Sequence, residues 1–242
     1  MDTAIETHDL TAVFPSRAGD VKALDRLNLT VETGHVFGFL GPNGAGKTTT
    51  MHILLGFIAA TSGHASLLGT DVRYSIARQR IGYLPEHSDT YRFLSGRELL
   101  AMTGRLFRMK SSPLRARVDA LLEEVGLERA ADRRIATYSR GMMQRICLAQ
   151  SLINDPDLVI LDEPTGGLDP LGRMDIRKII ARLRERGKTV FFSSHELSEV
   201  ELVCDRVAIL SKGRLVAEGR ASELARPGES LEKYFMKVVG AN

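Results

Sequence analysis

The chain has 242 residues, of which 43% are hydrophobic, so it is long enough for one large domain with a substantial core. Its 33 Lys and Arg residues nearly balance 30 Asp and Glu residues and form no basic block, so a formal net charge of +3 does not indicate nucleic-acid binding. The N-terminus lacks the apolar core of a signal peptide. The longest apolar stretch, residues 53–60, is far shorter than the roughly 20 residues that span a bilayer. We therefore expect any membrane role to require a partner.

The first 60 residues carry strand signals followed by one helix signal. Residues 5–13 and 27–31 have strand-like patterns, and the second run alternates apolar with polar side chains, which predicts an antiparallel layer. Residues 35–40 form a short apolar run that is typical of a buried strand. Residues 49–58 then carry apolar side chains at helical spacing, so we expect a strand, a loop and a helix in this order.

The loop between this strand and this helix fits the phosphate-binding pattern G-x-x-x-x-G-K-[ST]. Its glycines allow several backbone N–H groups to approach the α and β phosphates of a nucleoside triphosphate. Lys47 is placed to reach the β and γ phosphates, and the Thr48 hydroxyl is placed to bind Mg²⁺. A chance glycine-rich turn is the alternative, but it would not explain the flanking strand and helix. The residues expected to bind the nucleotide here are Gly41, Pro42, Asn43, Gly44, Ala45, Gly46, Lys47, Thr48 and Thr49.

The middle of the chain changes from mixed to helical character. Residues 65–68 and 81–84 are strand candidates, and residues 89–153 then carry helix signals. Ser95 and Glu98 have the spacing of a capping box, which marks the start of one of these helices. The segment therefore predicts an inserted helical lobe, and these signals indicate structure rather than chemistry.

From residue 155 onwards, strand and helix signals alternate along the chain. Alternation at this spacing predicts a mainly parallel sheet that is flanked by helices. The expected elements are strands over residues 158–161, 189–192 and 207–210, helices over 170–185 and 196–204, a hairpin over 211–214, and two short helices within 222–239.

Together these signals predict a single α/β domain with a P-loop NTPase core, a mainly parallel sheet, an N-terminal antiparallel β layer and an inserted helical lobe. Residues 1–88 and 154–222 are expected to form the nucleotide-binding core with its β layer. Residues 89–153 are expected to form the helical lobe, and residues 223–242 a C-terminal helical tail.

The two cysteines, Cys147 and Cys204, lie far apart in apolar segments with helical patterns. Neither has a partner at the spacing of a zinc site or a redox motif. We expect both to be reduced core residues, as in a cytosolic protein.

Two carboxylates follow the buried strand expected over residues 158–161. Alternation along a strand sends the side chains of Asp162 and Glu163 in different directions, so their roles can differ. Asp162 is suited to hold the Mg²⁺ shell through water, and Glu163 is suited to orient and polarise the water that attacks the γ phosphate. Acidic residues also occur at strand ends as simple caps, and the phosphate-binding loop is what favours the functional interpretation.

Four features of the sequence belong together: the phosphate-binding loop at residues 41–49, the segments 138–145 and 158–163, and His195. Together they resemble the nucleotide-binding subunit of ABC transporters. The resemblance covers nearly the whole chain, and it implies an ATPase that uses ATP and Mg²⁺.

The segment that begins at Tyr138 resembles the signature motif of this family, usually Leu-Ser-Gly-Gly-Gln. In the family this motif lies at a helix N-terminus and contacts the γ phosphate of ATP bound to the opposite subunit. Ser139 and Gly141 agree with the motif, whereas Tyr138, Arg140 and Met142 depart from it. A serine here can cap the helix, whose dipole favours an anion, although an ordinary capped helix would look the same.

The resemblance also assigns expected roles to four single residues. His195 resembles the switch histidine that keeps Glu163 and the attacking water in place, although a lone histidine is usually structural. Glu86 stands where the family usually carries a glutamine that senses Mg²⁺. Asp169 resembles a contact across the dimer interface and can also cap the helix before the following proline. Phe14 stands where an aromatic ring stacks on adenine, with simple packing as the alternative.

The family comparison implies a homodimer that holds two ATP molecules, with an integral membrane permease as a further partner. Ser139, Arg140, Gly141 and Asp169 are expected at the dimer interface. The permease is expected to dock beside Glu86 and the following residues 87–94, which places the chain on the cytoplasmic face of the membrane. The variant motifs resemble the bacterial exporter branch that handles drugs, lipids, polysaccharides or ions.

Two other functions compete with this interpretation. A soluble ABC-type ATPase that acts on ribosomes or DNA typically has two cassettes or a long coiled-coil insert, and this sequence has neither feature. A P-loop kinase for a small molecule would leave Ser139, Gly141 and His195 without a role. We therefore expect no nucleic-acid partner.

Overall fold

The computed structural model describes residues 2–17, 19–87, 90–224 and 231–240, and it contains two β-sheets. The first sheet consists of β1 (Thr3–Phe14), β2 (Val21–Glu32), β4 (Ser62–Leu67) and β5 (Thr70–Asp71). Its order is β2-β1-β4-β5 and all its pairings are antiparallel, as predicted for the N-terminal layer. The alternation predicted for residues 27–31 is confirmed, because one face of β2 packs on the core.

The second sheet carries the predicted nucleotide-binding core. It consists of β3 (Val36–Leu40), β6 (Ile81–Leu84), β7 (Leu158–Leu161), β8 (Thr189–Ser194), β9 (Arg206–Ser211) and β10 (Arg214–Arg220). Its order is β10-β9-β3-β8-β7-β6, and only the β9–β10 hairpin is antiparallel among the pairings of the described residues. Parallel strands end at the same edge, so the segments after β3, β7 and β8 meet there.

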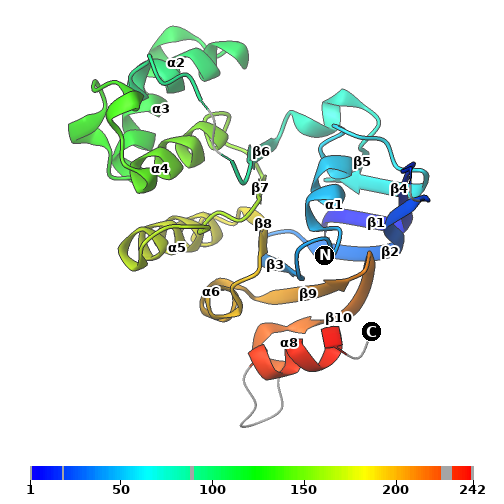
Figure 1. Cartoon of the computed structure of the whole chain (residues 1–242). Helices are drawn as coiled ribbons and strands as arrows, with labels where there is room; N and C mark the ends of the chain where they lie inside the picture. Colours follow the sequence, from blue (N-terminus) through cyan, green and yellow to red (C-terminus); the bar gives the residue numbers. More distant parts are fainter. Residues whose placement is uncertain (1, 18, 88–89, 225–230, 241–242) are drawn as a thin grey trace.

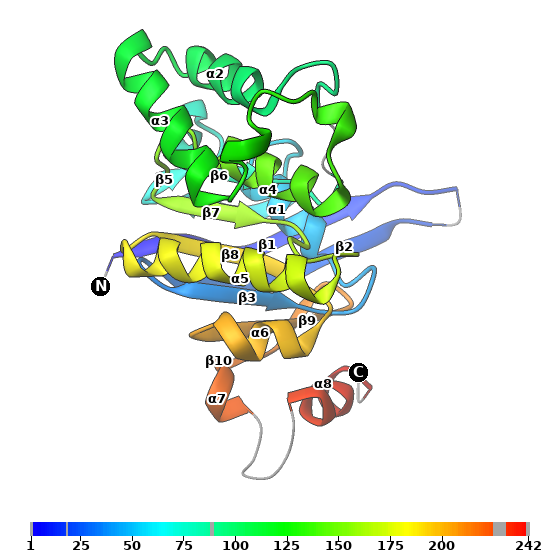
Figure 2. The same cartoon turned by 90° about the vertical axis from the view of Figure 1, so that its left-hand side faces the viewer.

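Both faces of the second sheet are covered, so β3 is buried over its whole length. Phe37 belongs to a core shared with the first sheet and α1 (Lys47–Leu54), whereas Val36 belongs to a core shared with α5 (Pro170–Glu185). Figures 1 and 2 show α1 on the side of the first sheet and α5 on the opposite face. The predicted mainly parallel sheet between helices is confirmed.

The helix predicted over residues 49–58 differs from the structure at both ends. It begins at Lys47, inside the phosphate-binding pattern, and ends at Leu54. Gly56 follows with φ of +70°, a left-handed conformation that does not continue an α-helix.

The segment between β6 and β7 is helical and projects away from the second sheet (Figure 1). Its first helix has the predicted capping box: Ser95 Oγ accepts from the Glu98 N–H at 3.2 Å, and Glu98 Oε2 accepts from the Ser95 N–H at 2.8 Å. The helices are α2 (Gly96–Leu106), α3 (Ser111–Glu124) and α4 (Arg140–Ser151), with short 3₁₀ turns at Glu128–Ala130 and Ile135–Thr137.

The C-terminal part adds α6 (Leu197–Val203), α7 (Ala221–Leu224) and α8 (Leu231–Gly240), and α8 packs beside α6 and the β9–β10 hairpin. The prediction of two short helices in this tail is confirmed, while residues 225–230 and 241–242 lie outside the described residues. Within the described part of the chain, no helix has the length and apolar character needed to cross a membrane.

Candidate functional site

The phosphate-binding loop connects β3 to α1 and packs closely against neighbouring backbone. A Cβ at Gly41 would lie 2.6 Å from the Leu210 carbonyl oxygen, and a Cβ at Gly46 would lie 2.6 Å from the Ala23 carbonyl oxygen. Gly46 also has φ of +106°, which residues with a side chain rarely adopt. Glycine is therefore required at both positions, and the loop takes a fixed shape at the N-terminus of α1.

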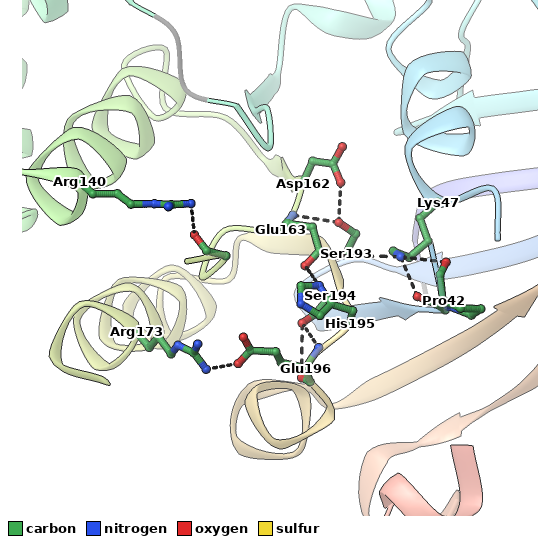
Figure 3. Close-up of polar contacts among 12 residues, drawn as sticks. Pro42, Lys47, Arg140, Asp162, Glu163, Arg173, Ser193, Ser194, His195 and Glu196 are labelled. Atoms are coloured by element: carbon green, nitrogen blue, oxygen red, sulfur yellow. Dashed lines mark hydrogen bonds and ion pairs between the residues drawn. The ribbon is translucent and has the colours of Figure 1, made fainter. Parts of the chain in front are cut away.

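Lys47 is the first residue of α1 and is only 7% exposed. Its Nζ donates hydrogen bonds to the carbonyl oxygens of Gly41 at 2.7 Å and Pro42 at 3.4 Å. The same nitrogen lies 3.8 Å from Oε1 of Glu163, as the close-up in Figure 3 shows. The loop thus holds its own ammonium group so that it faces a carboxylate from a different strand.

Asp162 and Glu163 follow β7 directly, and a serine of β8 connects them. Ser193 Oγ donates to Asp162 Oδ1 at 2.6 Å and accepts from the Glu163 N–H at 2.9 Å (Figure 3). Asp162 is 2% exposed, and Ser193 is completely buried. One hydroxyl group therefore fixes the positions of both acidic residues.

Glu163 has a backbone conformation that is rare for a residue with a side chain, with φ of +50°. Such conformations cost on the order of 1–3 kcal/mol and persist where the surroundings hold them. Here the Ser193 hydroxyl accepts from the Glu163 N–H, and the Glu163 carbonyl accepts from the Gly166 N–H at 3.0 Å. The two bonds hold the bend that follows β7 at Glu163.

His195 follows β8 and completes the surroundings of Glu163. Its Nδ1 lies 2.9 Å from Glu163 Oε2, and the imidazole is 55% exposed. Lys47 therefore lies near one oxygen of the Glu163 carboxylate and His195 near the other. Glu163 and His195 follow β7 and β8, and Lys47 follows the loop after β3, so the parallel sheet brings all three groups to one edge.

A cavity of about 450 Å³ lies over the phosphate-binding loop. Most of the residues predicted for the nucleotide line it, together with Glu86 and the Glu163–His195 pair. The lining consists of residues 21–23, residues 42–49, Glu86, Glu163, His195 and Lys212.

Two carboxylates, those of Asp162 and Glu86, act on the Tyr83 hydroxyl near this cavity. Burial raises the pKa of Tyr83 to about 12, and the charges of Asp162 and Glu86 contribute to the rise. Carboxylate oxygens are ligands that suit a hard divalent cation. Among the residues that the structure describes, however, no three His, Cys, Asp or Glu side chains are grouped so that they could hold a metal ion by themselves. A cation here would need further ligands, such as water or phosphate.

Ser139, Arg140 and Gly141 lie at the N-terminus of α4 and do not line the cavity. Ser139 Oγ accepts from the Met142 N–H at 3.3 Å, so the predicted helix cap is confirmed. Apart from its chain neighbours and the backbone of its own helix, Gly141 has no described heavy atom within 4 Å of the position that a Cβ would take. Arg140 reaches the loop after β7, where its Nη2 donates to the Gly166 carbonyl oxygen at 3.1 Å (Figure 3).

Asp169 and Phe14 also lie outside the cavity lining. The Asp169 carboxylate accepts from the Gly172 N–H at 2.8 Å, which confirms that it caps α5. Phe14 ends β1 and is 39% exposed. Its strand partner is Val21, which does line the cavity, so the aromatic ring belongs to the strand pair that borders the site.

Sequence reasoning did not single out Ser193, Lys212 or residues 21–23, which all belong to this site. A serine inside a strongly apolar strand was the available signal for Ser193, because a buried hydroxyl group requires a hydrogen-bond partner. Lys212 lies in the β9–β10 hairpin with φ of +47° and lines the cavity. Its hairpin position alone carries no signal of this contact.

Known proteins share both the sequence pattern and the fold. The sequence model described as "ABC transporter" matches residues 24–166. An ABC transporter ATP-binding protein of Synechocystis sp. is 44% identical over 94% of this chain and 66% of its own length. The Nod factor export ATP-binding protein I of Rhizobium meliloti is 41% identical over 97% of this chain and 70% of its own length.

A solved structure described as the ATP binding subunit of an ABC transporter is also similar. It has a TM-score of 0.85 and 28% sequence identity, and the alignment covers 97% of this chain and 99% of that chain. The chain spans about two thirds of the length of the curated relatives named above. The predicted α/β fold is confirmed, and the chain belongs to the family of ABC transporter ATP-binding proteins.

Proposed function

We propose that this chain binds ATP, hydrolyses it to ADP and phosphate, and powers transport through a separate membrane permease. The observation that carries the proposal is the Glu163 carboxylate, which is held between Lys47 and His195 beside the cavity over the phosphate-binding loop. Phosphoryl transfer requires positioning and charge stabilisation rather than covalent chemistry from the protein. The Glu163 carboxylate, the Lys47 ammonium and the His195 imidazole, which are fixed relative to one another, would provide this positioning and charge stabilisation.

The triphosphate is assigned to residues 41–49 at the N-terminus of α1, where free N–H groups and the helix dipole favour anions. The Lys47 ammonium would exchange the Gly41 and Pro42 carbonyl oxygens for phosphate oxygens. Phe14 is assigned to adenine, because its strand partner Val21 lines the cavity.

Mg²⁺ is assigned to the Thr48 hydroxyl, to Asp162 through water, and to Glu86. Mg²⁺ usually keeps several waters and binds one or two carboxylates together with substrate phosphates. Among the described residues, no three His, Cys, Asp or Glu side chains form a metal site, so water and phosphate oxygens would complete the coordination of Mg²⁺. When bound, the ion neutralises charge on the phosphates.

Glu163 is assigned as the residue that orients and polarises the attacking water. His195 holds one carboxylate oxygen at 2.9 Å, and the buried Ser193 hydroxyl holds the backbone of Glu163 at 2.9 Å. The direction of the carboxylate is therefore set before any substrate arrives, which lowers the reorganisation that catalysis requires.

A second copy of the chain is proposed to complete each ATP site. Ser139, Arg140, Gly141 and Asp169 lie outside the cavity lining, so a single chain does not bring them to its own phosphate-binding loop. The capped N-terminus of α4 and the open space at Gly141 suit a phosphate that another chain presents. A twofold, head-to-tail dimer would form both composite sites at once.

The proposed partner is an integral membrane permease, which places the chain on the cytoplasmic face of the membrane. We assign the docking surface to Glu86 and residues 87–94, of which 88 and 89 lie outside the described residues. Tyr91 and Phe93 are 54% and 68% exposed and contact each other edge to face, so they offer apolar area there. Export is the proposed direction, because the Rhizobium relative is named for Nod factor export.

Phosphate release from ATP and Mg²⁺ by the purified chain tests the enzymatic part. Glu163→Gln should lower kcat by about 100-fold or more while ATP binding persists, and ATP should then trap a dimer in light-scattering measurements. Glu185→Gln is the matched control, because Glu185 is an exposed acid at the end of α5. Equal rates for both variants would contradict the role of Glu163.

Co-purification in mild detergent tests the transport part. The full chain should bring down an integral membrane protein from the cells that express it. Recovery with ribosomes or DNA instead would contradict the proposed partner.

A further inference from the structure

The turn formed by residues 164–168 connects Glu163 to α5, and side chains from two helices bind alternate carbonyl groups of this turn. Gln144 of α4 donates to the Pro164 carbonyl oxygen at 2.9 Å. Arg140 of α4 donates to Gly166 at 3.1 Å, and Arg173 of α5 donates to Leu168 at 3.0 Å. The backbone between Glu163 and α5 is therefore held from both sides.

Arg140 fits this turn closely. Its guanidinium lies directly against Gly167, where a Cβ would come within 2.2 Å of the Arg140 Nη2. Gly167 also has φ of +65°, so glycine meets both the steric and the conformational requirement. Arg140 itself is exposed, so its side chain gains this position from the turn and not from burial in a core.

Arg173 extends the same connection to the histidine loop. In addition to Leu168, its guanidinium forms an ion pair with Glu196, the residue after His195 (Figure 3). The Glu196 N–H donates to Ser194 Oγ at 2.9 Å, which shapes the turn that carries His195. A continuous set of contacts thus runs from the start of α4 to His195.

We infer that Arg140 and Arg173 are positioning residues that connect the N-terminus of α4 to the Glu163–His195 pair through the 164–168 turn. This inference rests on the proposed function, in which the partner's ATP approaches Ser139 and Gly141. An anion at that helix end attracts the exposed Arg140 guanidinium, and any movement of Arg140 acts on the turn that adjoins Glu163. Closure of the dimer is then sensed at the catalytic pair through contacts within one chain.

Single alanine variants of the full-length chain test the connection. Misplacement of catalytic groups by about 1 Å can cost 100-fold in rate, so we expect Arg140→Ala and Arg173→Ala to lower kcat by about 10-fold to 100-fold. Neither residue lines the ATP cavity, so the Kd for a fluorescent ATP analogue should stay within about twofold of the wild-type value. A merely structural role would not separate kcat from Kd in this way.

Two matched controls remove arginine contacts of the same two helices without touching the turn. Arg145→Ala removes a 3.2 Å ion pair between α4 and Asp175, and Arg182→Ala removes a 3.0 Å hydrogen bond from the exposed Arg182 of α5 to the Glu124 carbonyl oxygen. Both controls should keep kcat within about threefold of the wild type. If Arg140→Ala and Arg173→Ala match these controls in a chain that hydrolyses ATP, the connection is refuted and the proposed function stands. A wild-type chain that does not bind ATP refutes both.

The double variant and a glycine pair provide independent readings. If both arginines act through one turn, the double variant should lose no more activity than the more damaging of the two single variants. Losses that multiply would refute a shared path. Gly167→Ala should reproduce the loss of Arg140→Ala because its Cβ displaces the guanidinium. Gly187→Ala imposes a similar backbone strain, with φ of +73° and no neighbouring atom within 4 Å of its Cβ, and it should not lower kcat in this way. Equal losses in the two glycine variants would count against the contact.

Discussion

Removal of the Ser193 hydroxyl group is expected to weaken both folding and hydrolysis, because this group serves two acidic residues. It donates to Asp162 at 2.6 Å, accepts from the Glu163 N–H at 2.9 Å, and is completely buried. A hydrogen bond to a charged group contributes about 1.5–3 kcal/mol, and a buried N–H without a partner costs about 1–3 kcal/mol. Because neighbouring effects do not add fully, we expect Ser193→Ala to lower the free energy of unfolding by about 3 kcal/mol.

Urea denaturation followed by far-UV circular dichroism measures this difference. Ser151→Ala is the matched control, because Ser151 is also buried and its hydroxyl donates only locally, to the Leu148 carbonyl oxygen at 2.7 Å. The control should lose about 1 kcal/mol or less. If the two variants are equally stable within about 0.5 kcal/mol, Asp162 and Glu163 do not depend on the Ser193 hydroxyl, and the reasoning is refuted.

Ser193→Ala should also lower kcat without weakening the binding of ATP. Ser193 holds the left-handed backbone of Glu163 but does not line the nucleotide cavity. We therefore expect kcat to fall by about 10-fold or more while the Kd for ATP stays nearly constant. Stopped-flow binding and phosphate-release assays separate the two quantities, and an equal loss in both would contradict a positioning role.

Gly46→Ala should abolish ATP binding in calorimetry, because its Cβ would lie 2.6 Å from the Ala23 carbonyl oxygen. Gly44→Ala, which has φ of +79° and open space around its Cβ, should retain ATP binding. The hydrogen bond from the Ser95 N–H lowers the pKa of Glu98 below its ordinary value of 4.5. The charged Glu98 carboxylate therefore stabilises the fold fully above pH 4.5, and this stabilisation is lost as the pH falls through the lower pKa of the folded state. Thermal denaturation of Glu98→Gln should accordingly show a deficit at pH 7 that shrinks in acid, and a constant deficit would disprove the linkage. Burial raises the pKa of the Cys204 thiol, although the residue is partly exposed, so a thiol reagent at pH 8 should label the native chain more slowly than the unfolded chain. Equal labelling rates would contradict the raised pKa.

Local sequence determined the parts of the site whose atoms come from one short segment. The phosphate-binding loop needs its glycines because backbone N–H groups must converge within nine consecutive residues, and the pattern for that is complete from Gly41 to Thr49. The Ser139 cap and the Ser95 capping box are similarly local, since each acceptor lies three residues from its donor. The order of strands and helices was also readable, because burial on both faces of a parallel sheet demands continuous apolar runs.

Tertiary structure alone decided which of these segments meet. Glu163 and His195 are 32 residues apart in sequence, and their 2.9 Å contact exists because β7 and β8 are parallel neighbours that end at the same edge. The Ser193 link and the placement of Arg140 against Gly167 have the same origin, since each depends on how separate elements pack. The sequence therefore predicted a phosphate-binding loop from one short segment. The pairing of strands and helices set how the acid, the histidine and the α4 N-terminus are held relative to that loop.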